Sequence, residues 1–225
     1  MTMNGLRLAG IAGAAFALGA TACGASQTPV ESASVAHPRA SHTDAPPWPD
    51  DASAWSSIHS ARFRMSIPLP DAASWTIDDA ARPELVATHA LTQSTVVVRS
   101  EIEPTLVNHA KCDERARTLG LFPDEARGAA LHTVEDVVTV GPEAYDTHIR
   151  VAIEATTAEG PIRGHVFAAG AYVRKCLFVH VSTEVPTGGG EPILSARLAL
   201  ARVRTLGGIR VDELGAVKRE SPDPH

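Results

Sequence analysis

The chain has 225 residues, of which 44% are hydrophobic, and its formal net charge is −6 at pH 7. A chain of this length and composition can bury a sizeable core. The negative charge, with no basic cluster, argues against nucleic acid or an anionic lipid surface as a binding partner.

The first 22 residues have the layout of a secretory signal peptide. Arg7 precedes an apolar stretch, Leu8 to Ala20, which is shorter than the roughly 20 residues that a stable membrane span needs. The sequence Ala20-Thr21-Ala22-Cys23 resembles a bacterial lipobox, which implies cleavage before Cys23 and attachment of acyl groups to it. The alternatives are ordinary cleavage after Ala22, which gives a secreted soluble protein, and an uncleaved anchor.

Residues 23–56 are predicted to form a disordered tether behind the lipidated Cys23. They are rich in Pro, Ser and Ala, so they bury too little surface to offset the entropy of the chain. Trp48 and Trp55 stand out in this tract, and we expect them either to dock a partner or to pack back on the edge of the domain. Residues 57–214 then form a single domain, and residues 215–225 are predicted to be a disordered tail.

Alternating and β-branched stretches predict a series of strands in this domain. Phe63, Met65 and Ile67 alternate with polar residues, which is typical of a half-buried strand. The predicted strands cover residues 61–68, 74–77, 85–91, 94–103, 132–140, 145–155, 163–169 and 173–183. The close spacing of the later strands favours an antiparallel meander.

Two helical segments complete the predicted domain. One opens at Thr105 and ends at Gly120. The other covers Ile193 to Leu206, because Glu191 and Pro192 are good helix-start signals and a glycine pair follows. The order of strands, helix, strands and helix predicts an α+β fold with helices packed on a mostly antiparallel sheet.

The arrangement resembles a PsbP-like α/β/α sandwich, a fold type shared by small DcrB-like bacterial lipoproteins. The resemblance lies in FRMSIPLPDAASW at residues 63–75, in the meander of strands, and in RLALARVRTL at residues 197–206. It implies a binding or assembly role and supplies no catalytic residues.

Cys112 and Cys176 remain as a pair once Cys23 carries lipid. An oxidising compartment favours a disulfide between them. In the chain-entropy model such a link contributes roughly 4 kcal/mol of stability. Two free buried thiols, or a redox or metal-binding role, are the alternatives, although the pair lacks the Cys-x-x-Cys spacing that lowers a thiol pKa.

His148, His165 and His180 lie on neighbouring predicted strands and are weak candidates for a metal site, since three converging imidazoles can hold zinc. We expect them instead to be histidines of a solvent face or groove. The simplest hairpin register places His165 near Cys176 and away from His180. We predict no bound metal, no cofactor and no catalytic residue.

We therefore predict a lipoprotein of the bacterial cell envelope with a non-catalytic binding or assembly domain. No Asp follows Cys23 directly, which by resemblance to Gram-negative sorting rules favours the outer membrane, facing the periplasm. The expected partners are the membrane, through the N-terminal lipid, and another envelope protein. The alternatives are a carrier of a small apolar ligand between sheet and helices, and a histidine-dependent metalloenzyme.

Overall fold

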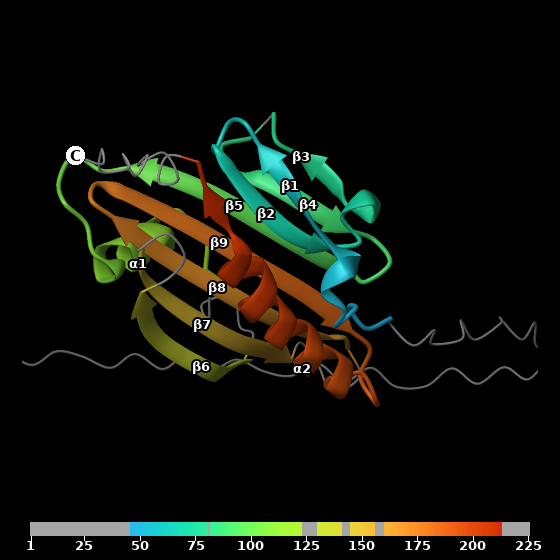
Figure 1. Ribbon diagram of the computed structural model, residues 1–225. Coiled ribbons are helices and arrows are strands. Elements are labelled where there is room, and N and C mark those ends of the chain that lie inside the picture. Colours follow the sequence, from blue (N-terminus) through green and yellow to red (C-terminus); the bar gives the residue numbers. More distant parts are fainter. Residues whose placement is uncertain (1–45, 81, 123–129, 141–144, 156–159, 213–225) are drawn as a thin grey trace, which may run out of the picture. The chain divides into compact units, whose positions relative to one another are not determined.

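The computed structural model describes residues 46–80, 82–122, 130–140, 145–155 and 160–212, which Figure 1 shows in colour. The predicted signal peptide, Cys23 and the predicted tail at 215–225 lie outside these residues, so the expectations about them stay predictions. Among the described residues, no helix combines the length and the apolar composition needed to cross a membrane.

A seven-stranded sheet forms the centre of the domain, and all its neighbouring strands are antiparallel. In spatial order it contains β3 (Thr76–Asp78), β4 (Leu85–His89), β5 (Ser94–Ile102), β9 (Lys175–Val185), β8 (Ile162–Tyr172), β7 (Asp146–Ala155) and β6 (Ala130–Val140). The predicted meander is therefore confirmed for β6 to β9.

A second, three-stranded sheet contains β1 (Trp55–Ser60), β2 (Met65–Pro70) and β10 (Arg210–Val211). The strand predicted from residue 61 begins only at Met65, because residues 61–64 form a turn. The backbone N–H of Phe63 donates to the Ser60 hydroxyl at 3.1 Å, and Arg64 takes a left-handed conformation with φ of 51°. The turn lets β1 pair with β2, a pairing that the sequence pattern did not indicate.

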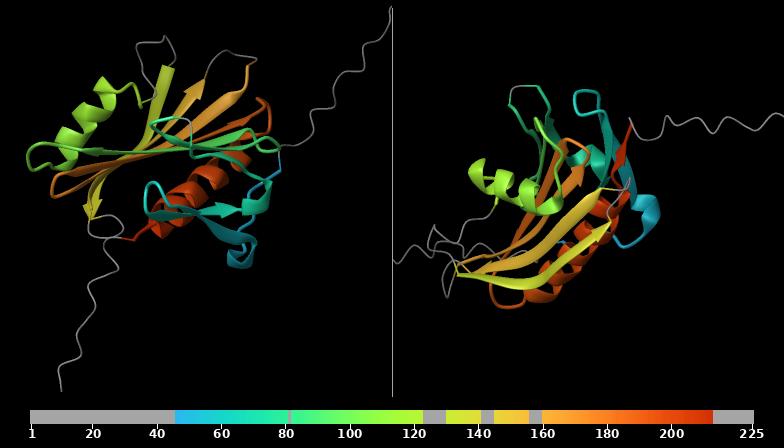
Figure 2. Two further views of the ribbon diagram at one scale, coloured as in Figure 1. Left: turned by 90° about the horizontal axis from the view of Figure 1, so that it is seen from above. Right: turned by 90° about the vertical axis from the view of Figure 1, so that its left-hand side faces the viewer.

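Two helices lie on opposite faces of the seven-stranded sheet (Figure 2). α1 (His109–Thr118) packs on β7, β8 and β9 from one side. α2 (Glu191–Leu200) packs on β8 and β9 from the other, and continues as the π-helical segment η5 (Ala201–Leu206). The predicted α+β class is confirmed, with the α/β/α layering that the sequence resemblance implies.

The main hydrophobic core lies on the α2 face of the large sheet. The β2 side chains Met65, Ile67 and Leu69 have no exposed surface and belong to the same buried cluster as the inner residues of β5, β8 and β9. α2 approaches β8 closely at Gly164, where a Cβ atom would lie 2.8 Å from side-chain carbons of Leu194 and Leu198. The absence of a side chain at this position therefore sets the distance between helix and sheet.

The segment before β1 belongs to the domain rather than to the tether. Trp48 is only 4% exposed, and its ring contacts Trp55 and Trp75 at centroid distances of 6.0 and 6.2 Å. The predicted boundary at residue 57 is therefore wrong, because two tryptophans in an otherwise polar tract provide enough apolar surface to order it. Of the two roles weighed for these tryptophans, packing on the domain is the one observed.

Arg197 of α2 fixes this segment from inside the core. Its side chain is fully buried, and Nη2 donates to the carbonyl oxygen of Pro46 at 2.6 Å. Nη1 donates at 2.9 to 3.2 Å to the carbonyl oxygens of Thr92 and Glu184 and to the Thr183 hydroxyl. Within the described part of the chain no carboxylate pairs with it, and burial lowers the pKa of the guanidinium to about 10.

Replacing Trp48 tests whether the segment is structural. We expect Trp48→Ala to lower the free energy of unfolding by about 3 kcal/mol, because a large buried ring leaves a cavity in the core. Urea denaturation measures this change. Deletion of residues 26–39, which lie before the folded segment, serves as the control and should leave the midpoint unchanged. A Trp48→Ala protein as stable as its parent would contradict the role assigned to this segment.

Candidate functional site

The described residues form a cavity on either face of the seven-stranded sheet. An apolar pocket lies on the α2 face, and a polar cleft lies on the α1 face, beside the helix. The two differ in chemistry because alternate residues of each strand point to opposite faces.

The apolar pocket has a volume of about 430 Å³. Its walls are mainly buried apolar side chains from β7, β8 and β9, from Tyr145 just before β7, and from the stretch that runs from η5 into β10. They include Tyr145, Ile149, Ala168, Leu177, Val179, Leu206, Ile209 and Val211. Its volume falls in the range of about 300–1,000 Å³ that is typical of small-molecule sites.

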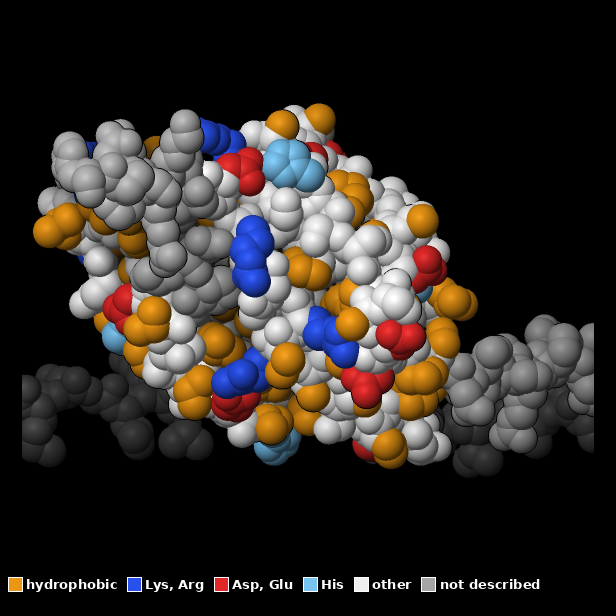
Figure 3. Space-filling view, viewed as in Figure 1, with side chains coloured by type: hydrophobic (Ala, Val, Ile, Leu, Met, Phe, Trp, Pro, Cys, Tyr) orange, Lys and Arg blue, Asp and Glu red, His pale blue; other side chains and the backbone are white. Residues whose placement is uncertain are grey.

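The rim of the apolar pocket includes η5. Arg202 lies there, and its charge is balanced by Glu135 of β6, with an Nη2–Oε1 distance of 2.5 Å. Val203 beside it is 65% exposed. Figure 3 views this side of the molecule and shows basic and apolar side chains interspersed over it. π-helical turns recur at functional sites, and here one forms the border of an uncharged cavity.

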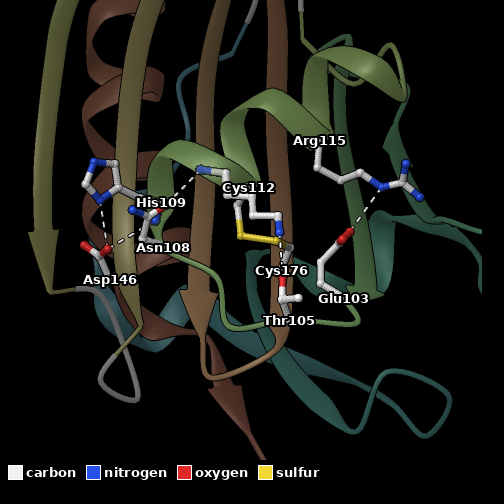
Figure 4. Close-up of a disulfide and its surroundings, with 9 residues drawn as sticks. Glu103, Thr105, Asn108, His109, Cys112, Arg115, Asp146 and Cys176 are labelled. Atoms are coloured by element: carbon white, nitrogen blue, oxygen red, sulfur yellow. Dashed lines mark hydrogen bonds and ion pairs between the residues drawn. A yellow bond between two sulfur atoms is a disulfide. The ribbon is translucent and has the colours of Figure 1, made fainter.

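On the other face, α1 is joined to the sheet by a disulfide (Figure 4). Cys112 of α1 and Cys176 of β9 are bonded, with their Cα atoms 5.5 Å apart. The predicted pair is thus confirmed. A loop with a sequence separation of 64 residues is closed, and its constraint on the unfolded chain corresponds to roughly 4 kcal/mol.

α1 begins at His109 rather than at Thr105. The Asn108 side chain accepts a hydrogen bond from the N–H of Lys111 at 3.0 Å and caps the helix. The preceding chain stays extended because the Val107 N–H donates to the Val173 carbonyl at 2.9 Å. A pairing between segments so far apart in the sequence overrides the local helical spacing.

His148 joins three elements beneath α1. Its Nδ1 contacts Asp113 of α1, and its Nε2 contacts Asp136 of β6. Burial lowers the pKa of His148, but the two carboxylates outweigh it and the net shift is upward. Arg150 also faces Asp136, at 3.4 Å, and the pKa of Asp136 is lowered, chiefly by its bond to His148. His148 therefore acts as a structural cation that holds α1 and β6 to β7.

The polar cleft lies over the part of the sheet that extends beyond α1, with a volume of about 640 Å³. Two of its lining residues form a pair: His165 Nδ1 lies 3.0 Å from His180 Nε2, and the rings stack with their centroids 5.2 Å apart. His165 Nε2 lies 3.1 Å from a carboxylate oxygen of Glu154. Because an ionised carboxylate only accepts, a neutral His165 donates from Nε2 and accepts the Nε2–H of His180 at Nδ1.

Both imidazoles of this pair are uncharged at neutral pH. Burial is the main cause of a lowered pKa for His165, which Glu154 partly opposes. For His180, burial together with the neighbouring His165 and Arg163 lowers the pKa to about 3. The pair is therefore a neutral hydrogen-bonded unit rather than an acid–base couple working near pH 7.

The charged groups of the cleft are paired with one another. Arg163 Nη2 lies 2.8 Å from Glu184, and Arg163 Nη1 lies 3.9 Å from Glu154. Two carboxylates share one guanidinium, so these groups together are negatively charged and disfavour an anionic ligand.

The structure separates the three histidines that the sequence suggested as metal ligands. His165 and His180 meet because β8 and β9 pair with Phe167 opposite His180 and with Ala171 opposite Cys176. The expected register, with His165 near Cys176, is therefore wrong. His148 lies elsewhere, between Asp113 and Asp136. Among the described residues, no group of three or more His, Cys, Asp or Glu is arranged to hold a metal ion.

The sequence did not indicate the roles of Arg197 and Arg202. Arg197 holds the segment before β1, and Arg202 lies at the rim of the apolar pocket. Both lie in the stretch RLALARVRTL. The position of Arg197 on the same helical face as Leu194 and Ala201 was an available signal, because a charged residue on a buried face needs internal partners.

Comparison with known proteins adds structural similarities only. No family model matches the chain, and no curated protein matches it significantly in sequence. The Ran-binding protein Mog1p of Saccharomyces cerevisiae is a structural neighbour with 10% identity and a TM-score of 0.48, covering 71% of this chain and 97% of its own.

A second neighbour is LpqN of Mycobacterium tuberculosis, described as involved in cell envelope biogenesis. It has 9% identity and a TM-score of 0.39, covering 68% of this chain and 87% of its own. A Bacteroides thetaiotaomicron protein has 13% identity and a TM-score of 0.40, covering 70% and 48%. We take the fold class from the strand order and helix packing described above.

The two contacts of His148, with Asp113 and with Asp136, are together called the His148 clamp. From the clamp we predict that the free energy of unfolding depends on pH. A folded-state pKa above the ordinary value of 6.5 contributes stability that is complete below that value and is lost as pH rises through the folded pKa. We expect the stability difference between the parent and His148→Gln to be largest near pH 5 and to shrink toward pH 9.

Urea denaturation over this pH range measures the difference. His132→Gln, which replaces an exposed histidine on β6, is the control and should show no such trend. A difference that grew with rising pH would show that His148 is not bound as a cation.

Proposed function

We propose that this chain is a lipid-anchored, non-catalytic binding protein of the bacterial cell envelope, and that the apolar pocket takes up a small uncharged apolar ligand. The observation that carries this proposal is the pocket of about 430 Å³ between η5 and the sheet. It joins two of the functions weighed from the sequence, a binding domain and a carrier.

The lining of the pocket supports an uncharged ligand. Its walls are apolar, and the guanidinium of Arg202 at the rim is already neutralised by Glu135. A ligand with a carboxylate or phosphate would have to displace Glu135, at the cost of leaving that carboxylate without its partner. An apolar molecule needs no such exchange and gains roughly 25 cal/mol for each Å² of apolar surface that it buries.

The arrangement of polar groups supports a binding role over catalysis. His148 holds two carboxylates, and His165 is committed to Glu154 and His180. General acid–base catalysis calls for a group that titrates near the working pH and faces the substrate. Both histidines are instead engaged in holding the fold together.

Envelope anchoring is proposed from the lipobox-like sequence before Cys23. Two or three acyl chains would hold the protein firmly, since each buried CH₂ contributes about 0.8 kcal/mol. The residues that the structure describes begin at Pro46, and 22 residues lie between Cys23 and Pro46. This length lets the domain stand clear of the bilayer while the anchor stays in it.

Replacing the sulfur of Cys23 with oxygen tests whether this residue carries the lipid anchor. Cys23→Ser should abolish incorporation of labelled palmitate and release the protein from the membrane fraction, because a hydroxyl cannot form the thioether. Mass spectrometry of the parent protein should find an acylated N-terminal cysteine, and the variant should have an intact signal peptide or a plain terminus. Unchanged labelling in the variant would contradict lipidation at Cys23.

A substitution at the rim tests the pocket. Val203→Asp places a charge beside the opening, and we expect the affinity for the uncharged fluorophore N-phenyl-1-naphthylamine to fall about tenfold, because an apolar contact is lost and a charge must be kept hydrated. Fluorescence titration measures it. Val134→Asp is the matched control, since Val134 is 64% exposed on β6, away from the pocket lining. Equal loss in both variants, or no binding by the parent, would contradict the proposal.

A further inference from the structure

The polar cleft contains a row of hydroxyl groups from residues that lie far apart in the sequence and are aligned only by the pairing of the strands. In the strand registers, Thr76 lies opposite Thr88, Thr88 opposite Thr95, and Thr95 opposite Ser182. Directly paired residues project from the same face of a sheet. The four hydroxyl side chains therefore form one line across β3, β4, β5 and β9, and all four line the cleft.

The row continues into the histidine pair. Ser182 lies opposite His165 on β8. Neighbouring strands are about 4.8 Å apart, so the four hydroxyl groups extend over roughly 14 Å. This is a regular array of small hydrogen-bonding groups, which ends at a buried, neutral imidazole.

These hydroxyl groups are available to a ligand. Within the described part of the chain, none of the four side chains has a hydrogen-bond partner, and Thr76 and Thr88 are exposed. By contrast, Ser94 and Thr183 on the opposite, α2 face bond to each other at 2.8 Å. Hydroxyl groups serve both as donors and as acceptors, so the row offers both roles repeatedly.

The next row of side chains disfavours an anionic ligand, because its two carboxylates outnumber its one guanidinium, and all three groups are already engaged with one another. Glu184, Arg163 and Glu154 lie opposite one another on β9, β8 and β7 and are paired among themselves. Phe122 lines the cleft as well, packed on Phe167 at 3.9 Å, and supplies an apolar contact. In the part of the chain that the structure describes, the polar groups of the cleft that have no partner are therefore these hydroxyl groups, and they lie in the same cleft as the ring of Phe122.

We propose that the polar cleft binds a neutral polyhydroxylated ligand, a segment of an uncharged oligosaccharide, along the row from Thr76 to Ser182. Sugar hydroxyl groups would exchange hydrogen bonds with the row, and the apolar face of a sugar ring would contact Phe122. The site is separate from the apolar pocket, because the two lie on opposite faces of the sheet.

Titration of the full-length mature protein with neutral hexasaccharides of glucose and of N-acetylglucosamine tests this site. We expect saturable binding of at least one of them by isothermal titration calorimetry. Affinity should change little with added salt, because no net charge is neutralised. The backbone NMR signals of β5 and β9 should shift more than those of η5.

The double variant Thr95→Val, Ser182→Ala removes the two neighbouring hydroxyl groups at the β5–β9 end of the row, next to the histidine pair, and keeps its shape. We expect about a tenfold weaker affinity, since each lost hydrogen bond contributes a few-fold. Thr133→Val, on β6 and outside the cleft lining, is the control and should bind as the parent does. The thermal unfolding midpoints of all three proteins verify that the fold is kept.

The assignment would be overturned if the parent bound neither sugar, if the double variant kept its full affinity, or if the shifts were confined to the apolar pocket. Val203→Asp separates this site from the proposed function, because a charge at the pocket rim should leave sugar affinity unchanged. Loss of sugar binding in Val203→Asp, with its fold intact, would place the ligand in the other cavity and refute the cleft.

Discussion

The buried guanidinium of Arg197 is the interaction on which the N-terminal half of the fold depends. Its Nη1 and Nη2 groups donate to the carbonyl oxygens of Pro46, Thr92 and Glu184, so one side chain links the segment before β1, the turn between β4 and β5, and the end of β9. A buried cation is costly unless its donors are satisfied. These hydrogen bonds can form only when the three segments lie together. Burial of the Arg197 guanidinium is therefore favourable only in the correctly folded arrangement.

The two faces of the large sheet differ in the interactions that they make. On the α2 face, apolar side chains from the sheet meet α2, η5 and β2 and leave an uncharged pocket. On the α1 face, the disulfide and the His148 clamp hold a short helix over the middle of the sheet, and the polar cleft lies beside it. The sheet thus presents an apolar cavity to one side and a hydrogen-bonding cavity to the other.

The sequence predicted the parts of this fold that local patterns encode. Strand positions from Thr76 to Val185, the C-terminal helix, and the pairing of Cys112 with Cys176 were all anticipated, because alternation, glycine punctuation and cysteine count are readable residue by residue. The start of the domain was placed too late, since the burial of Trp48 depends on Trp75 and Arg197, which lie far along the chain. The contact between His165 and His180 was missed because it depends on strand register, which a one-residue shift in the turn at Val173 and Arg174 would change.

The attachment of Pro46 to Arg197 has a mechanical consequence. A pull along the chain from its N-terminal side reaches α2 before it reaches any strand of the large sheet. α2 runs directly into η5, so the load would arrive at the border of the apolar pocket. In a protein held at a surface by its leading end, the width of that opening would then respond to tension.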